Sequence, residues 1–201
     1  MTQIAILILA AGGSTRMGPG RDKLLEAVAG QPLLARAIGQ ACATGAQVFV
    51  ALPGPDHPRT ALRLGSCAQA VYVADAAEGM AASIRAGVAA LPAQIDAVMI
   101  LPADMPEVTG DDLQTVMDGF VAGHGKAIAQ ACSDDGRPGH PVIFPRRCFA
   151  ALTRLSGDRG AKSLLAGDSL PVRQIPLPAA HALTDLDTPQ DWADWRRGQP
   201  G

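Results

Sequence analysis

A stretch of small and basic residues near the N-terminus has the composition of an anion-binding loop. The apolar run QIAILILA (3–10) passes into AAGG (10–13), and Arg16, Arg21 and Lys23 follow closely. Small residues let a ligand approach the backbone, and exposed peptide N–H groups are suited to face anionic oxygens. Arginine and lysine then neutralise a polyphosphate. We therefore predict a phosphate site here, in preference to a plain turn with solvated charges.

Two common phosphate motifs do not fit this stretch. Gly13 and Gly18 have the glycine spacing of a P-loop, but Pro19 stands where the motif requires lysine. A dinucleotide fingerprint beginning at Gly12 would need glycine where the chain has Ser14. The expected phosphate loop therefore belongs to another class.

A second candidate group is acidic. Asp104 in LPADMPE (101–107) follows an apolar run and stands between two prolines, which leave few backbone donors for its carboxylate. Carboxylate oxygens suit Mg²⁺, which takes one or two protein ligands together with substrate phosphates. We expect Asp104 to bind this metal; the alternative is that it caps the turn before Thr109.

Two further carboxylates lie near the C-terminus, in the segment TDLDTPQDW. Asp185 and Asp187 share a face if the chain is extended there, and they could then meet a metal held by Asp104. Pro189 suits the first position of a helix, so capping of that helix by Asp187 or Thr188 is a competing interpretation.

Alternating elements must position these residues. Apolar runs of strand length predict strands at 3–10, 47–52, 70–75, 96–102, 126–132, 140–144 and 171–176. Apolar residues at helical spacing predict helices at 31–45, 79–91, 109–120, 146–155, 159–166 and 189–197. This order is typical of a single α/β domain with a Rossmann-like, doubly wound, mostly parallel sheet, in which ligands bind beyond the carboxyl ends of the strands.

Two local features support the helices expected at 79–91 and 109–120. In the helix at 79–91, Met80 and Ile84 lie on the face expected to be buried. The helix at 109–120 begins with a capping-box-like pair, Thr109 and Asp112.

Composition narrows the class of protein. The 201 residues are 48% apolar, 18% charged and only 3% aromatic, which is typical of a globular domain with an aliphatic core. The formal net charge of −2 argues against a broad nucleic-acid-binding surface. No apolar run approaches the roughly 20 residues of a membrane helix, and no signal peptide is visible, so we expect a cytoplasmic protein without a membrane partner.

The four cysteines lie at positions 42, 67, 132 and 148. None of them forms a C-x-x-C pair or a zinc-like cluster with histidine. We expect four small buried thiols in a reducing compartment.

The motifs together resemble those of the NTP-transferase superfamily, most of all its molybdenum cofactor cytidylyl- and guanylyltransferases. LAAGGSTRMG, followed by DK, resembles the nucleotide signature; LPADMPEV resembles the metal segment; and GMAASIRAG resembles the nucleotide-side helix. GHPVIF, GDRGAKSLL and DLDTPQDW resemble the substrate-side segments. The resemblance implies a nucleotide-diphospho-sugar transferase type of fold, with a nucleotide half at 1–106, an acceptor half at 107–197 and a frayed tail at 198–201.

The resemblance also implies a role for particular residues. The implied catalytic residues are Arg16, Lys23 and Asp104. The implied nucleotide-binding residues are Leu9, Ala10, Ala11, Gly12, Gly13, Ser14, Arg16, Lys23, Gly79 and Ser83. The implied acceptor-binding residues are His140, Gly157, Asp158, Gly160 and Lys162, and the implied Mg²⁺ ligands are Asp104, Asp187 and Asp185.

The reaction that the resemblance implies is nucleotidyl transfer. A phosphate of the acceptor attacks the α-phosphorus of a nucleoside triphosphate, and pyrophosphate leaves. Ala11, in LAAG rather than LAGG, favours CTP over GTP, and molybdopterin is the implied acceptor. A molybdoenzyme or its chaperone is the implied protein partner.

Other functions stay open. PADMP differs from the glycine-aspartate-glutamine turn often found in cytidylyl enzymes, which keeps GTP and a sugar-phosphate acceptor as alternatives. A non-catalytic module that senses nucleotide or delivers a cofactor is a further alternative. The chain shows no G-x-S-x-G elbow, as expected for a reaction that depends on positioning and charge neutralisation.

Overall fold

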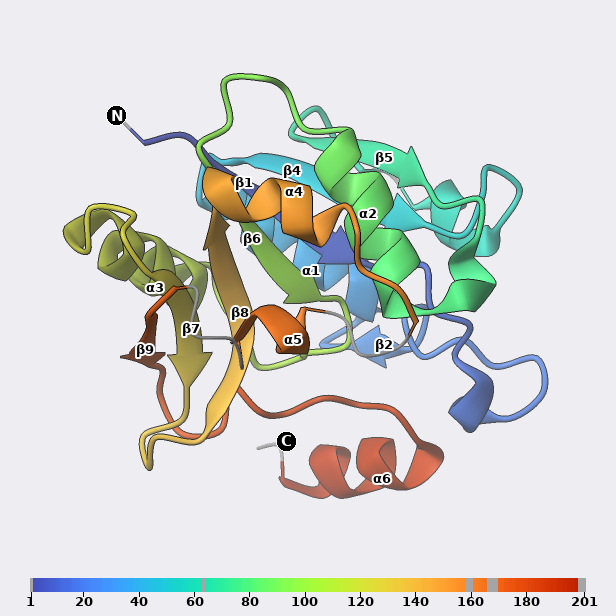
Figure 1. The fold of residues 1–201 in the computed structure, drawn as a ribbon. Helices are drawn as coiled ribbons and strands as arrows, with labels where there is room; N and C mark the ends of the chain where they lie inside the picture. The colour runs from blue at the N-terminus through green and yellow to red at the C-terminus, as the bar shows by residue number, and fades with distance from the viewer. Residues whose placement is uncertain (1, 63, 158–160, 166–169, 199–201) are drawn as a thin grey trace.

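A central sheet organises the chain. The computed structural model describes residues 2–62, 64–157, 161–165 and 170–198. The sheet strands are β1 (Ile4–Leu9), β4 (Gln47–Leu52), β5 (Ala68–Tyr72), β6 (Ala97–Pro102), β7 (Ile128–Cys132), β8 (Pro138–Pro145) and β9 (Val172–Pro176). They form one 7-stranded sheet in the order β5-β4-β1-β6-β8-β7-β9 (Figure 1).

The sheet is mostly parallel, as the alternation of elements predicts. β1 pairs in parallel with β4 and β6, and β4 pairs in parallel with β5. β8 runs antiparallel to both of its neighbours, and β9 returns parallel to β7. β1 therefore lies inside the sheet, and the order of strands changes direction beside it, at the place where such sheets bind ligands.

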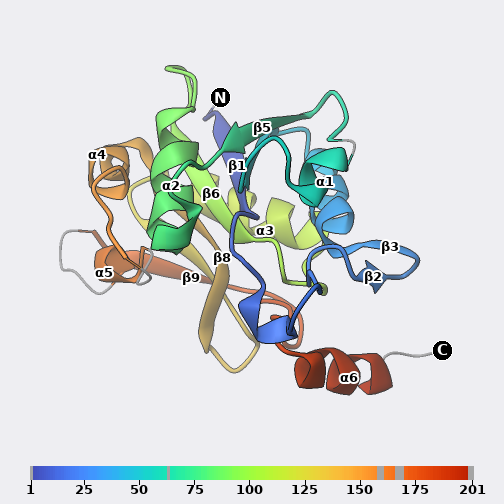
Figure 2. The same cartoon turned by 90° about the vertical axis from the view of Figure 1, so that its right-hand side faces the viewer.

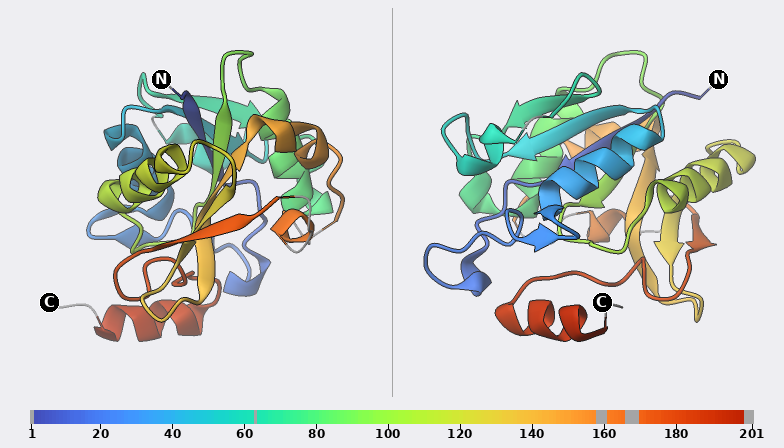
Figure 3. Two further views of the ribbon diagram at one scale, coloured as in Figure 1. Left: turned by 60° about the vertical axis from the view of Figure 1, so that its left-hand side comes forward. Right: turned by 180° about the vertical axis from the view of Figure 1, so that it is seen from behind.

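Helices cover both faces of the sheet. They are α1 (Leu33–Ala43), α2 (Met80–Ala89), α3 (Gly110–Ala122), α4 (Phe149–Leu152), α5 (Lys162–Leu165) and α6 (Pro189–Gly198). Figure 2 shows α1 and α3 on one side of the sheet and α2 and α4 on the other, and the right-hand view of Figure 3 shows the face that α1 and α3 cover. Successive residues of β1 point to opposite faces, so Ile6 packs in the core under α1 and α3, and Leu7 packs in the core under α2.

Several short elements were not predicted from the sequence. A two-stranded hairpin joins β2 (Ala27–Val28) to β3 (Gln31–Pro32), and 3₁₀ turns occur at η1 (Thr15–Met17), η2 (Pro58–Ala61), η3 (Ala76–Glu78) and η4 (Arg146–Cys148). They are too short to produce a periodic pattern, and tertiary contacts decide them.

Some expected elements have other bounds. The helix expected at 146–155 is a 3₁₀ turn followed by the four-residue α4. Of the helix expected at 159–166, α5 forms the described part. Gly198 ends α6 instead of belonging to a frayed tail, and 199–201 lie outside the described residues. Met80 is 40% exposed, so the prediction that it packs in the core was wrong, whereas Ile84 is fully buried.

The prediction of four buried thiols was wrong for two cysteines. Cys42 and Cys67 form a disulfide that joins the C-terminal end of α1 to the segment before β5. They are 25 positions apart, and the docking of α1 on β4, the neighbour of β5, brings them together. Cys132 and Cys148 are free and buried, as expected. Because disulfides persist in oxidising surroundings, the cysteines no longer support a reducing compartment.

None of the helices in the described part of the chain is long and apolar enough to cross a membrane.

The disulfide is expected to stabilise the fold by restricting the unfolded chain. Closing a loop of this length contributes about 3 kcal/mol to the free energy of unfolding. Urea unfolding with and without dithiothreitol should show this loss, and the Cys42→Ser/Cys67→Ser double variant should not respond to the reductant. Equal midpoints for oxidised and reduced wild-type protein would contradict the expectation.

Gly87 lies where α2 packs closely on β1 of the sheet. A Cβ atom at this position would lie 2.3 Å from Cδ1 of the fully buried Leu7, whereas Gly39 on the exposed face of α1 has nothing within 4 Å. We expect Gly87→Ala to destabilise the protein by about 1–3 kcal/mol. Gly39→Ala, the matched control, should stabilise it by about 0.5–1 kcal/mol. Thermal unfolding of both variants measures the difference, and an equal effect of the two substitutions would contradict this packing.

Candidate active site

The loop after β1 lies at the carboxyl end of the parallel strands. Ala10 and Ala11 are buried, and Gly12 and Gly13 are exposed. The Ala10 N–H donates to the Ala51 carbonyl of β4 at 3.0 Å, which holds the start of the loop against the sheet. Leu9, at the end of β1, leads into it. The stretch predicted to approach a phosphate is therefore presented at the edge where ligands bind.

Ser14 turns the loop away from the sheet. Its backbone has φ 50°, in the left-handed region, and the short η1 turn follows. A polar side chain tolerates this conformation better than a branched apolar one does. Its hydroxyl donates to Asp22 Oδ1 at 3.1 Å and accepts from Arg59 Nη2 at 2.9 Å.

Lys23 joins the loop to the acidic residues. Its Nζ lies 2.5 Å from Asp104 Oδ2 and 2.5 Å from Asp187 Oδ1, and the three side chains are only 14–17% exposed. Burial lowers the pKa of Lys23, but the charges and hydrogen bonds of Asp104 and Asp187 raise it by more, so the group is firmly protonated. The structure thus brings together one predicted catalytic cation and two predicted metal ligands.

Arg16 completes this charged group from the solvent side. Its Nη2 lies 2.8 Å from Asp187 Oδ2, and its side chain is 68% exposed. An exposed ion pair contributes little to stability. Arg16 therefore keeps the freedom to exchange its carboxylate partner for a phosphate.

The segment before α6 is held so that Asp187 is free to face Lys23. The Leu186 N–H donates to the Asp104 carbonyl at 3.1 Å. Thr188 accepts from the Asp191 N–H, and the Asp191 carboxylate accepts from the N–H groups of Thr188 and Asp187. Thr188 and Asp191 therefore cap α6 as a reciprocal pair, and the Asp187 carboxylate contacts Lys23 and Arg16 instead.

Asp185 lies within electrostatic range of the same group. Burial, and then the negative charges of Asp104 and Asp187, raise its pKa. Within residues 2–62, 64–157, 161–165 and 170–198, no three His, Cys, Asp or Glu side chains form a group that could hold a metal ion. Asp104 and Asp187 nevertheless direct oxygens at one cation, the ammonium of Lys23, and hard oxygen donors fit Mg²⁺ or Mn²⁺.

The predicted acceptor residue His140 lies on the other side of this edge, near the start of β8. His140 donates its N–H to the Ala182 carbonyl at 2.9 Å, and a Cβ on Gly139 would lie 2.0 Å from that carbonyl, so only glycine fits there. The ring Nδ1 of His140 is buried and has no hydrogen-bond partner among the described residues. Burial lowers the pKa of His140; the negative charge of Asp104 raises this pKa, and the positive charge of Lys162 lowers it further. A neutral histidine with an unpaired ring nitrogen is thus held near Asp104.

Gly79 and Ser83, which were predicted to bind the nucleotide, lie at the start of α2 and within it. Gly79 precedes α2 with φ 104°, in the left-handed region, and Ser83 is buried within the helix. The Ala81 N–H donates to the Gly157 carbonyl at 3.3 Å, so the predicted nucleotide helix and acceptor segment are neighbours. The predicted acceptor residues Asp158 and Gly160 lie outside the described residues.

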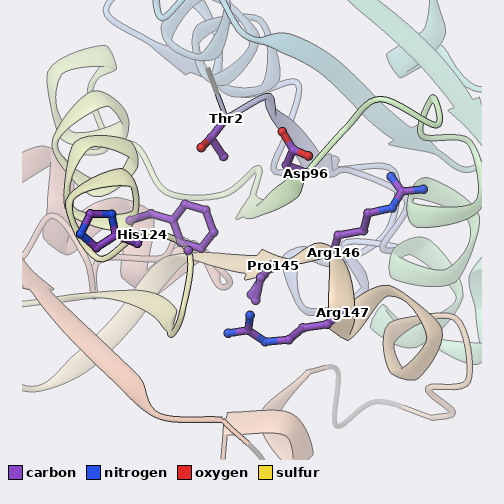
Figure 4. A pocket seen from close by; sticks show the side chains of 8 residues that line it. Thr2, Asp96, His124, Pro145, Arg146 and Arg147 are labelled. Atoms are coloured by element: carbon purple, nitrogen blue, oxygen red, sulfur yellow. The ribbon is translucent and has the colours of Figure 1, made fainter.

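A cavity of about 530 Å³ lies elsewhere (Figure 4). It is lined by Thr2, Asp96, Phe120, His124, Gly125, Pro145, Arg146 and Arg147, at the starts of β1 and β6. That is the amino-terminal edge of the parallel strands, opposite the loop after β1. It therefore contains none of the residues predicted to do chemistry.

Sequence reasoning missed one central residue, Arg59. Its side chain is 1% exposed and contacts Asp22, Ser14 and the carbonyls of the loop after β1. It lies in a proline- and glycine-rich connection with no motif around it. A lone arginine in such a connection is indistinguishable from a surface residue until the tertiary structure is known.

The sheet, the small-residue loop after β1 and the charged group of Lys23, Asp104 and Asp187 are typical of an α/β nucleotide-binding class. Within that class, the chain belongs to the family described by the MobA-like NTP transferase domain, whose model matches residues 6–174. Rv0371c from Mycobacterium tuberculosis H37Rv is 31% identical, with a TM-score of 0.81 over 98% of this chain and 97% of that one. A structure of Rv0371c in complex with manganese has a TM-score of 0.82 over 98% of this chain and all of that one, at 27% identity.

Other similar proteins show how widely the fold is used. The bifunctional protein GlmU of Cutibacterium acnes is 34% identical over 116 residues, which are 57% of this chain and 28% of GlmU. The chain thus spans about a quarter of the length of the curated relatives it matches. Molybdopterin-guanine dinucleotide biosynthesis protein A from Archaeoglobus fulgidus has a TM-score of 0.66 at 18% identity, over 94% of this chain and 95% of that one, and shares the fold.

Replacing Lys23 by methionine should leave Asp104 and Asp187 without the cation that they share. Losing the charged hydrogen bonds of Lys23 should lower the free energy of unfolding by about 1.5–3 kcal/mol. Mn²⁺ should then raise the melting temperature of Lys23→Met by several degrees more than that of wild type, because a metal replaces the missing ammonium. Lys126→Met, at an exposed position, is the control. An equal Mn²⁺ effect on all three proteins would contradict convergence of Asp104 and Asp187 on a cation.

Proposed function

We propose that the protein is a nucleotidyltransferase that transfers a nucleoside monophosphate from a nucleoside triphosphate to a phosphorylated acceptor. The observation that carries this proposal is the position of Lys23. Its ammonium bridges Asp104 and Asp187 beside the small-residue loop after β1. Such a site holds cations and peptide N–H groups where a triphosphate can bind, and family membership supports the same reaction class.

The proposed catalysis consists of positioning and charge neutralisation. The N–H groups of the loop bind the triphosphate. Lys23 and Arg16 stabilise the negative charge that grows on the departing pyrophosphate. The acceptor phosphate attacks the α-phosphorus in line with the leaving group, so the protein needs no nucleophile of its own.

Asp104 and Asp187, with Asp185 close by, are the residues that would hold a divalent cation. Their oxygens already enclose one positive charge, and the similar Rv0371c was solved in complex with manganese. Mg²⁺ held there would neutralise phosphate oxygens and orient them. Lys23, displaced from the carboxylates, would then be free to contact a phosphate.

The acceptor is proposed to bind on the side of His140. The unpaired ring nitrogen of His140 offers a hydrogen bond to it, and Lys162 with the segment from Gly157 through Asp158 and Gly160 supplies the anion-binding part. Lys162 is exposed and starts α5, which suits a phosphate-bearing ligand.

For the substrates themselves we propose CTP and molybdopterin. Ala11 is a buried residue of the loop after β1. LAAG resembles the cytidylyl branch, and we propose that a methyl group at position 11, where the guanylyl branch has glycine, leaves less room for the base of the nucleotide. A molybdoenzyme or its chaperone would then be the protein partner. We propose the cytoplasm as the compartment because it holds nucleoside triphosphates; the disulfide of Cys42 and Cys67 is the observation against it.

Two other substrate pairs have specific support. The fold shared with the molybdopterin-guanine dinucleotide protein keeps GTP as a nucleotide. The segment PADMP, which resembles the guanylyl and sugar-phosphate branches, keeps a sugar phosphate as an acceptor. A non-catalytic delivery module has less support, because Lys23, Asp104 and Asp187 are retained together in one charged group.

Pyrophosphate release separates these functions. We expect turnover with Mg²⁺, molybdopterin and CTP, and much less with GTP, ATP or UTP. Glucose 1-phosphate serves as the sugar-phosphate acceptor. Asp104→Asn should lower kcat/KM about 10²–10³-fold, because it removes charge that organises the transition state. Asp134→Asn, at an exposed position, is the matched control.

The other outcomes are equally definite. Turnover with GTP would overturn the argument from Ala11 and leave the reaction class intact. Turnover with the sugar phosphate alone would overturn molybdopterin as the acceptor. Nucleotide binding without pyrophosphate release from any acceptor would contradict catalysis and favour the delivery module.

A further inference from the structure

We propose that Arg59 is a positioning residue that aims the peptide N–H groups of the loop after β1 at the triphosphate. The inference rests on the proposed function in one respect, namely that a nucleoside triphosphate binds this loop. It adds a buried ion pair, Arg59 with Asp22, to the residues on which nucleotide binding depends.

All five N–H groups of the Arg59 guanidinium have an acceptor. Nη1 donates to the carbonyls of Ala10, at 2.5 Å, and Gly12, at 2.8 Å. Nη2 donates to Ser14 Oγ at 2.9 Å and to Asp22 Oδ1 at 2.7 Å, and Nε donates to Asp22 Oδ2 at 2.7 Å. This is the full donor capacity of arginine, so the contacts fix the side chain of Arg59 in one position against the loop.

Asp22 balances the buried positive charge. It receives a two-pronged contact from Arg59 and further hydrogen bonds from Ser14 Oγ at 3.1 Å and from the Leu24 N–H at 3.0 Å. Burial raises the pKa of Asp22, but the hydrogen bonds and charge of Arg59 lower it by more, so the carboxylate stays ionised. Asp22 immediately precedes Lys23, so the same ion pair also fixes the backbone from which Lys23 extends.

Because peptide groups are planar, the contacts of Arg59 with the loop carbonyls also set the direction of the loop N–H groups. In a trans peptide unit the C=O and N–H groups point in opposite directions. Because Arg59 binds the carbonyls of Ala10 and Gly12, the N–H groups of Ala11 and Gly13 point away from Arg59. Neither N–H donates a hydrogen bond to a residue in the described part of the chain, so both are left for an anionic ligand.

This arrangement changes the expected role of Ser14. Its hydroxyl is engaged by both Arg59 and Asp22. We therefore assign Ser14 to the support of the loop, where the sequence resemblance implied a direct contact with the nucleotide.

Lysine at position 59 keeps the charge and loses the geometry. An ammonium has three donors on one nitrogen and cannot reach two carbonyls, a hydroxyl and both carboxylate oxygens together. Arg59→Lys should therefore leave the chain folded with a loop whose N–H groups are no longer held in one direction.

The matched control is Arg146→Lys. Arg146 also places one guanidinium nitrogen on two backbone carbonyls, those of Ala93 at 2.7 Å and Ile95 at 2.6 Å. It does so at the opposite edge of the sheet. The two variants thus lose the same kind of contact, in one case at the proposed triphosphate loop and in the other far from it.

The experiment is calorimetric titration of CTP, GTP, ATP, UTP and inorganic tripolyphosphate into wild type and both variants, with thermal unfolding recorded in parallel. We expect Arg59→Lys to weaken binding of tripolyphosphate and of the preferred nucleotide at least tenfold, while the matching nucleoside binds wild type and variant alike. Arg146→Lys should bind every ligand as wild type does. If Arg59→Lys does not fold, Asp22→Asn takes its place, because it removes the charge that pairs with Arg59. Its binding of the same ligands is then compared with that of wild type.

The outcomes separate this inference from the proposed function. If wild type binds a triphosphate and Arg59→Lys binds it within twofold, the inference is overturned and the proposed function stands. An equal loss for nucleoside and triphosphate would show a general structural role and would also overturn the inference. If wild type binds neither triphosphate nor tripolyphosphate, the proposed function fails first, and the inference fails with it.

Discussion

The contact on which the site depends is the ammonium of Lys23 between the carboxylates of Asp104 and Asp187. The three residues come from the loop after β1, the loop after β6 and the segment before α6. Lys23 is 81 positions from Asp104 and 164 positions from Asp187 along the chain. Two carboxylates held this close repel each other unless a cation lies between them. Lys23 supplies that cation, so the N-terminal and C-terminal segments are held at the same edge of the sheet.

A second cation, Arg59, holds the loop after β1 in place. Arg59 donates hydrogen bonds to two carbonyl groups of this loop, whereas Lys23 contacts the carboxylates beside it. The division matters because a peptide has two polar sides: once its carbonyls are engaged, its N–H groups face the other way. The loop then combines buried small residues, a fixed direction and adjacent positive charge, which are the requirements for binding a polyphosphate. The disulfide of Cys42 and Cys67 closes the segment of chain that carries Arg59.

Local patterns predicted much of this architecture. The buried strands, the parallel order and the capping box of Thr109 and Asp112 follow from periodicity and from residues a few positions apart. The position of the loop after β1 and of Asp104 follows from strand ends in the same way. Lys23, Asp104 and Asp187 lie together in the structure; their roles in catalysis and metal binding remain predictions.

What the sequence left open depends on contacts between distant segments. Whether Asp187 or Thr188 caps α6 is decided by Lys23 and Arg16, which engage the Asp187 carboxylate. The pairing of Cys42 with Cys67 depends on how α1 docks on β4, and the burial of Arg59 depends on how its connection folds back against the loop after β1. None of these leaves a periodic or motif-like trace along the chain.

The most direct test is a crystal structure of the protein with Mg²⁺ and a CTP analogue whose α–β bridge is a methylene group. We predict that the triphosphate oxygens contact the N–H groups of Ala11 and Gly13, and that Lys23 has moved from Asp104 to a phosphate. A triphosphate bound elsewhere, for example in the cavity beside Arg146 and Arg147, with the contacts of Lys23 unchanged, would contradict it.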